Sequence, residues 1–173
     1  MGMKRKLAGL ALLAAAGVVF PACGFAATSI PSSSAVPATI IFTANNPTSN
    51  PTDSGSSAAT ISFTTTGGAN ARTWSVQVRA TSANFGSCPS TVPVTQVTVS
   101  CGSATVSGGG GSGSCGGSFN LSNALQTVAS GSEGTGANRA YMVTLSFTFT
   151  DSWAYLPQAS ACTLPLSYTI TAN

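Results

Sequence analysis

The sequence predicts a single all-β domain behind an N-terminal export signal. Two long stretches near the C-terminal end alternate strictly between apolar and small hydroxyl side chains, and several shorter stretches do the same. Clusters of Gly, Pro, Asn and Ser separate these stretches, and beyond the N-terminal apolar run no segment has helical periodicity. Alternation with a period of two is typical of strands that bury one face.

Residues 1–26 have the organisation of a secretory signal peptide. The basic stretch Lys4–Lys6 precedes the apolar run Leu7–Phe20, and small residues at Gly24 and Ala26 predict cleavage after Ala26. The apolar run is shorter than the roughly 20 residues that a membrane span needs. We therefore expect an exported protein, extracellular, on the cell surface or in the periplasm, without a transmembrane segment.

Cys23 raises the alternative of a lipid anchor, because a cysteine after the apolar run of a signal can be lipidated. Phe20 and Pro21 occupy positions where a lipobox has an aliphatic and a small residue. We expect Cys23 to be removed with the signal peptide.

Little charge remains in the mature chain. The whole sequence is 5% charged and contains no His, whereas about 25% charge is usual. The mature chain keeps three basic and three acidic residues, so its formal net charge is 3 − 3 = 0: Arg72, Arg79, Arg139, Asp53, Glu133 and Asp151. Without a basic patch, no nucleic-acid partner is expected. Without His or Lys, Ser/His/Asp and Cys/His catalysis are excluded, and the protein is expected not to be an enzyme.

Four cysteines remain, and in an exported chain they predict two disulfides with three possible pairings. Cys88 and Cys101 bracket the expected strand Val94–Ser100, which spans about 20 Å, whereas bridged Cα atoms lie about 5.5–6 Å apart. This distance disfavours a Cys88–Cys101 bridge and leaves two pairings. Of these we favour Cys101–Cys115, which closes the glycine loop between them, together with Cys88–Cys162, which ties an inner segment to the last strand. No C-x-x-C pair is present, so neither a metal site nor a cofactor is expected.

The N-terminal half of the mature chain begins with a Ser-, Pro- and Ala-rich stretch, Ala27–Ala38, which predicts a flexible leader. Strands are expected at Thr39–Ala44, Ala59–Thr65 and Trp74–Ala80. The Gly-Gly-Ala-Asn turn at Gly67–Asn70 predicts that the last two strands pair as a hairpin.

The middle of the chain is less regular. A strand is expected at Val94–Ser100, and weaker ones at Phe119–Leu121 and Leu125–Ala129. Ser107–Ser118 is almost entirely Gly and Ser around one cysteine. That composition predicts a flexible surface loop.

The last two stretches, Arg139–Thr150 and Cys162–Ala172, carry the clearest alternation. Because they are neighbours joined by a loop, we expect them to form an antiparallel pair. Pro165 cannot donate to a ladder, which indicates an edge or a bulge at that point. Seven or eight short strands then predict one immunoglobulin-like antiparallel β-sandwich over residues 39–173, held by disulfides.

The outward residues of these strands predict one uncharged hydroxyl surface. Its expected members are Thr144, Ser146, Thr148, Thr150, Thr163, Ser167, Thr169 and Thr171, together with Thr60, Ser62 and Thr64. Thr favours strands, so an ordinary solvent face explains the pattern. Soluble proteins usually place Lys and Glu there, however, so the lack of charge favours association.

The export signal, the Ser/Thr/Gly-rich strands, the cysteine pairs and the apolar final strand loosely resemble secreted bacterial β-sandwich subunits of surface assemblies, of the pilin-like and spore-coat type. The resemblance implies a non-enzymatic structural subunit of an extracellular filament, coat or matrix, which binds copies of itself or other cell-surface proteins. Such subunits often add a strand to a neighbour's sheet. Residues 38–44, with Ile40, Ile41 and Phe42, are the candidate donor, and an ordinary first strand of the same sandwich is the alternative.

A second function class rests on the loop that joins the last two strands. Asp151, Trp153 and Tyr155 place an acid and two aromatic rings there, and exposed rings can stack on sugars. With the hydroxyl surface, this loop predicts a monomeric adhesion or carbohydrate-binding module with a glycan ligand. The alternative is that Trp153 folds back over the end of the sandwich.

Overall fold

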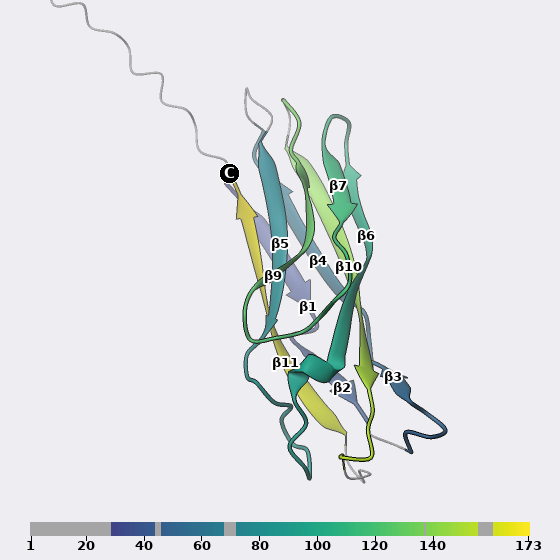
Figure 1. Cartoon of the computed structure of the whole chain (residues 1–173). Coiled ribbons are helices and arrows are strands. Elements are labelled where there is room, and N and C mark those ends of the chain that lie inside the picture. The colour runs from purple at the N-terminus through teal and green to yellow at the C-terminus, as the bar shows by residue number, and fades with distance from the viewer. Residues whose placement is uncertain (1–28, 44–45, 68–71, 137, 156–160) are drawn as a thin grey trace, which may run out of the picture.

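A computed structural model describes residues 29–43, 46–67, 72–136, 138–155 and 161–173 as a β-sandwich (Figure 1). Eleven strands form two antiparallel sheets, joined by loops and one short 3-10 helix at Val94–Gln96. The predicted all-β, disulfide-bonded sandwich is confirmed. The expected signal peptide, its cleavage site after Ala26 and Cys23 lie outside the described residues. Within the described residues, no helix is long and apolar enough to cross a membrane.

Each sheet draws its strands from both halves of the chain. Sheet 1 has the order β1 (Ser32–Val36), β4 (Ala59–Thr65), β10 (Arg139–Thr150), β6 (Val97–Ser107) and β8 (Phe119–Asn120), and β3 (Thr52–Ser54) also pairs with β10. Sheet 2 has the order β2 (Thr39–Phe42), β11 (Cys162–Ala172), β5 (Thr73–Ala80), β9 (Gln126–Ser132) and β7 (Ser112–Cys115). The immunoglobulin-like strand order stays a prediction.

Alternating apolar residues of both sheets meet in one core. At one end of the sandwich the Phe63 ring stacks on Tyr141 at 5.0 Å and meets the Trp74 ring at 5.2 Å. At the other end Phe42 and Phe149 lie 5.9 Å apart. Burying each such side chain stabilises the fold by about 1.5–3 kcal/mol, so the core needs no ion pairs.

Two predicted strand pairings are wrong. β10 and β11 do not pair: β10 lies between β4 and β6 in sheet 1, and β11 lies between β2 and β5 in sheet 2. Likewise β4 pairs with β1 and β10, whereas β5 pairs with β11 and β9. In both cases the connection crosses from one sheet to the other. Alternation reports that a strand has a buried face, but it does not report which strand lies beside it.

The predicted flexible leader is also wrong over Ser32–Val36, which forms β1 and pairs antiparallel with β4. The chain then changes sheets at the cis peptide bond between Val36 and Pro37 and continues as β2. Within β1 only Ala35 is half-buried. An edge strand that buries so little leaves no alternation in the sequence, and for this reason its composition resembles that of a leader.

The predicted Gly/Ser surface loop contains ordered structure. β6 extends to Ser107, and Ser112–Cys115 forms β7 against β9. Gly113 allows β7 to lie close to β6 and to the Trp74 ring, because a Cβ at this position would lie 2.8 Å from the Ala104 carbonyl oxygen and 3.1 Å from that ring. The Trp74 indole donates a hydrogen bond to the Ser112 carbonyl at 3.2 Å. Composition alone predicts flexibility here because it cannot register these long-range contacts.

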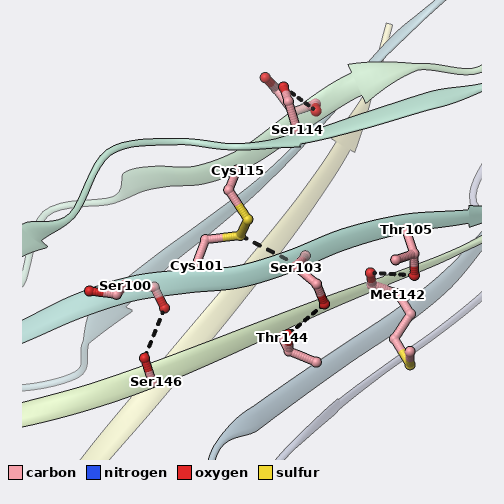
Figure 2. Close-up of a disulfide and its surroundings, with 10 residues drawn as sticks. Ser100, Cys101, Ser103, Thr105, Ser114, Cys115, Met142, Thr144 and Ser146 are labelled. Atoms are coloured by element: carbon pink, nitrogen blue, oxygen red, sulfur yellow. Dashed lines mark hydrogen bonds between the residues drawn. A yellow bond between two sulfur atoms is a disulfide. The ribbon is translucent and has the colours of Figure 1, made fainter.

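Both disulfides have the pairing that the sequence analysis favours. Cys101 in β6 joins Cys115 in β7, with Cα atoms 5.4 Å apart, and so links sheet 1 to sheet 2 (Figure 2). Cys88 joins Cys162 at the start of β11, with Cα atoms 4.9 Å apart. Two disulfides point to an oxidising environment.

Candidate interaction surfaces

The predicted donor segment is part of its own sandwich. Ile40 and Phe42 are buried and pair through β2 with the first residues of β11. On the opposite edge of β2, the Ile41 carbonyl accepts a hydrogen bond from the Ser56 amide at 3.0 Å, and the Ile41 amide donates to the Ser56 hydroxyl at 3.1 Å. This arrangement corresponds to the ordinary-strand alternative. Donation to a neighbour would require the segment to leave both partners.

The three residues of the predicted ligand loop do not converge. Asp151 is buried, its carboxylate accepts a hydrogen bond from the Ser152 amide at 2.7 Å, and its own amide donates to the Pro51 carbonyl at 3.0 Å. The Tyr155 ring lies 6.0 Å from that of Phe149, and burial raises the pKa of its phenol. Trp153 remains 71% exposed. The interpretation that Trp153 covers the sandwich end is therefore wrong, since Tyr155 packs there instead.

The three acidic residues lie at opposite ends of the sandwich. Asp53 and Asp151 lie near the end of β10, where the Asp53 carboxylate accepts a hydrogen bond from the Thr43 amide at 3.2 Å. Glu133 is buried just before the start of β10. No three His, Cys, Asp or Glu side chains of the described segments group as metal ligands would. The carboxylates of Asp53 and Asp151 instead accept hydrogen bonds from backbone amides of loop residues.

The predicted single hydroxyl surface is in fact two surfaces on opposite sides of the molecule. Residues of β4 and β10 face outward from sheet 1, and those of β11 face outward from sheet 2. On sheet 1 the Ser103 and Thr144 hydroxyls lie 2.7 Å apart (Figure 2). On sheet 2 the Ser75 and Thr171 hydroxyls lie 2.7 Å apart. On both surfaces, then, hydroxyl groups of neighbouring strands bond one another.

Sheet 1 has a shallow depression of about 500 Å³ on its outer face. Met142, which is 44% exposed, and the small side chain of Ala140 line it between rows of hydroxyls from β1, β4 and β6. Its lining contains no charged residue. The depression adds an apolar contact point to an otherwise hydroxyl-covered surface.

The two lateral sides of the sandwich differ. On the first, which we call the closed side, β6 and β7 are linked by Cys101–Cys115. On the other, the open side, β1 in sheet 1 faces residues 166–172 of β11 in sheet 2, and a groove of about 270 Å³ lies between them. Ile30, Ala35, Tyr168 and Ile170 supply its apolar lining. Figure 1 shows β6 and β7 at one side and β11 at the other.

Sequence reasoning missed the open side. The sequence feature that could have indicated it is the lack of any Lys, Glu or Asp from Leu166 to Ala172, because exposed strand edges usually carry charge. Pro165, which the sequence analysis assigns to an edge or a bulge, lies where β5 ends at Ala80, and its carbonyl accepts a hydrogen bond from the Thr81 amide at 3.1 Å. The missing proline N–H therefore faces β5 and not the open side.

Comparisons of this chain with protein-family models, with curated proteins and with solved structures found no match.

Proposed function

We propose that this chain is a non-enzymatic structural subunit of an extracellular filament, coat or matrix. One observation carries the proposal: the outer faces of both sheets are rich in hydroxyl groups and nearly lack the charges that keep exported proteins apart. Among the strand residues that the structure describes, Arg79 is the one charged side chain at an outward position. Surfaces without charge tolerate close contact with copies of themselves.

The hydroxyl groups also make burial of these faces inexpensive. Burying a polar group costs free energy chiefly when it loses water without gaining a partner. Here Ser32 and Thr64 lie 2.6 Å apart on sheet 1, and Ser112 and Ser132 lie 2.9 Å apart on sheet 2. Because each of these pairs already shares one hydrogen bond, a contacting molecule that displaces water leaves fewer of their polar groups unpaired. This property favours a protein whose faces are covered in its working state.

The disulfides support the same proposal. A subunit outside the cell meets proteases and dilution without chaperones, and cross-links that constrain the unfolded chain stabilise it there, by about 2–4 kcal/mol each. Cys88–Cys162 closes a separation of 74 residues and Cys101–Cys115 one of 14 residues.

The test measures assembly of residues 27–173 with both disulfides formed. We expect particles larger than one chain by sedimentation velocity and by negative-stain microscopy. A variant that places charge on the sheet 1 face, Met142→Lys with Ser146→Lys, should assemble less. The matched control, Asn50→Lys with Asn123→Lys, adds the same charge on exposed loop residues and should assemble like the wild type. A wild-type chain that stays monomeric at every accessible concentration would contradict the proposal.

A second candidate function, a monomeric adhesion or carbohydrate-binding module, is favoured by Trp153, whose ring is 71% exposed. Exposed rings of this kind stack on sugar faces. Pull-down on insoluble polysaccharides should then retain the wild type and lose Trp153→Ala. Tyr155→Ala is expected to act through folding instead, since that ring packs on Phe149.

A further inference from the structure

We propose that the open side is a homodimer contact, in which β11 of one copy pairs antiparallel with β11 of a second copy about Ile170. This inference deepens the proposed function, on which it rests, by naming one contact of the assembly. It depends on backbone groups, on side-chain size and on charge along residues 166–172.

The hydrogen bonds of β11 alternate between its two edges. Thr73 and Asn173 exchange both amide bonds, at 3.2 and 2.9 Å, and the register continues through Thr171 opposite Ser75 and Thr169 opposite Gln77. Since antiparallel partners alternate in this way, the odd-numbered residues of β11 face β5. The even-numbered residues face the opposite edge, where the Leu166 amide donates to the Ala38 carbonyl at 2.8 Å.

Beyond Leu166, this edge of β11 has no backbone partner within the part of the chain that the structure describes. The N–H and C=O groups of Tyr168, Ile170 and Ala172 point away from β5 and make no backbone hydrogen bond to any residue that the structure describes. A row of such groups is a template for another strand. If a second β11 lies there in antiparallel register about Ile170, Ile170 pairs with its counterpart and Tyr168 pairs with Ala172 of the second copy. Each pair can exchange two N–H···O bonds.

In the same register, the side chains of the even-numbered residues of β11 are complementary in size to those of the second copy. Tyr168, Ile170 and Ala172 face inward over the groove and are only half-buried. The register places a large Tyr168 beside a small Ala172 of the second copy, and Ile170 beside Ile170, so the two grooves would close over one another. On the outer face Thr169 would meet Thr171 of the second copy, a favourable cross-strand pair.

The lack of charge along this edge permits a second copy as the partner. Residues 166–173 contain no charged side chain, and the mature chain has a formal charge of 3 − 3 = 0. Two copies therefore approach edge to edge without repulsion. β2 occupies the same edge from Cys162 to Pro165, which limits the free length to the stretch that this register uses.

The experiment compares two variants that differ in the sign of one charge. In the proposed register Thr169 lies directly opposite Thr171 of the second copy, in a pair without mutual hydrogen bonds, where side chains are closest. Thr169→Lys with Thr171→Lys places like charges in contact, and Thr169→Lys with Thr171→Glu places opposite charges in contact. Both variants lose the same Ser75–Thr171 hydroxyl contact, so that loss is common to their monomers, and the effect of the added charges within one chain is read from their urea midpoints.

We expect the wild type and the Lys/Glu variant to be dimers by sedimentation equilibrium at concentrations at which the Lys/Lys variant is a monomer. Equal urea midpoints for the two variants in their monomeric state would show that folding is intact. Amide hydrogen exchange gives a second readout. Tyr168 and Ile170 amides should exchange like unprotected ones in the Lys/Lys variant and be protected in the wild type, whereas Thr169 and Thr171 in the wild type stay protected at any concentration.

Three results would overturn the inference. If the Lys/Lys variant forms the same large assemblies as the wild type, this contact is wrong and the proposed function stands. If both variants are monomeric alike, the antiparallel register about Ile170 is wrong. If the wild type is monomeric, the inference and the proposed function fail together, even if the edge accepts a strand of another protein.

Discussion

The closed side and the open side of this sandwich show two ways to end a β-sheet. On the closed side Cys101–Cys115 joins the sheets, and a Cβ on Gly113 would lie 2.8 Å from the Ala104 carbonyl oxygen, so the two strands lie in contact. On the open side β1 and β11 leave a groove of about 270 Å³ with polar backbone on one wall. The cross-link holds the edges of the two sheets together on the closed side, whereas an unpaired, uncharged edge is a template for another strand.

The two sides also show that the amino-acid composition of a segment does not determine whether its edge is paired. The closed side is built from the Gly- and Ser-rich stretch that looks flexible in the sequence, because small residues permit close approach. On the open side β11 contains Thr, Ile and Tyr, residues that favour strands, whereas β1 is rich in Ser. A segment with high strand propensity can thus still be left with an unpaired edge.

The largest expected effect tests the packing behind the closed side. Trp74 is 1% exposed and its indole bonds the β7 backbone. We expect Trp74→Ala to lower the free energy of unfolding by about 3–5 kcal/mol, measured by urea denaturation followed by circular dichroism. Trp153→Ala is the matched control, since this 71% exposed ring should change stability by no more than about 0.5 kcal/mol. Equal losses in the two variants would contradict the comparison.

The next effect removes the cross-link itself. Cys101→Ser with Cys115→Ser opens a loop with a sequence separation of 14, for which we expect a loss of about 3 kcal/mol. Amide exchange should speed up in β7, making the closed side resemble the open one. The Cys88→Ser, Cys162→Ser variant should also lose stability but leave β7 protected in the folded state. Unchanged protection in β7 without Cys101–Cys115 would mean that glycine packing alone closes this side.

The smallest effect concerns the open side. The Tyr168 hydroxyl donates to the Pro37 carbonyl at 3.1 Å, and Tyr168→Phe should cost about 0.5–1.5 kcal/mol. Burial raises the pKa of the Tyr168 phenol in the folded state. In the unfolded chain the phenol ionises at a lower pH, near 10. The contribution of the buried neutral phenol to the free energy of unfolding is therefore complete below about pH 10 and is lost as the pH rises above it. Tyr168→Phe should therefore flatten the alkaline loss of stability in urea titrations between about pH 9 and pH 11. An identical slope in both proteins would assign the loss to other groups.

The sequence predicted those parts of the fold that depend on local pattern. Ala59–Thr65 matches β4 because Ile61 and Phe63 alternate with hydroxyl residues. Chain geometry disfavoured one of the three disulfide pairings, and the observed pairing is the one of the other two that closes the glycine loop. The pattern could not report that β10 and β11 lie in different sheets, since both facing sheets bury the same kind of residue. It also overlooked β1, whose side chains stay mostly exposed.

The candidate sites were harder to predict than the fold. Exposure of Trp153 and burial of Asp151 depend on how the loop meets the sandwich end, which residue types do not encode. The unpaired edge of β11 follows from where β2 stops and where β1 joins the other sheet. Where β2 stops and which sheet β1 joins are both properties of strand order. In the sequence, the lack of charge from Leu166 to Ala172 was the one indication of an unpaired edge.

The bridge between β6 and β7 gives the sandwich a preferred direction of opening. While Cys101 and Cys115 remain joined, β6 and β7 cannot separate, whereas on the opposite flank the chain itself links the layers at Val36–Pro37. Beyond that crossing, we expect water, a protease or an incoming polypeptide to gain access first along β1 and residues 166–172 of β11. Formation of this one disulfide thus determines which flank of the folded chain is accessible, both to a protease and to a binding partner.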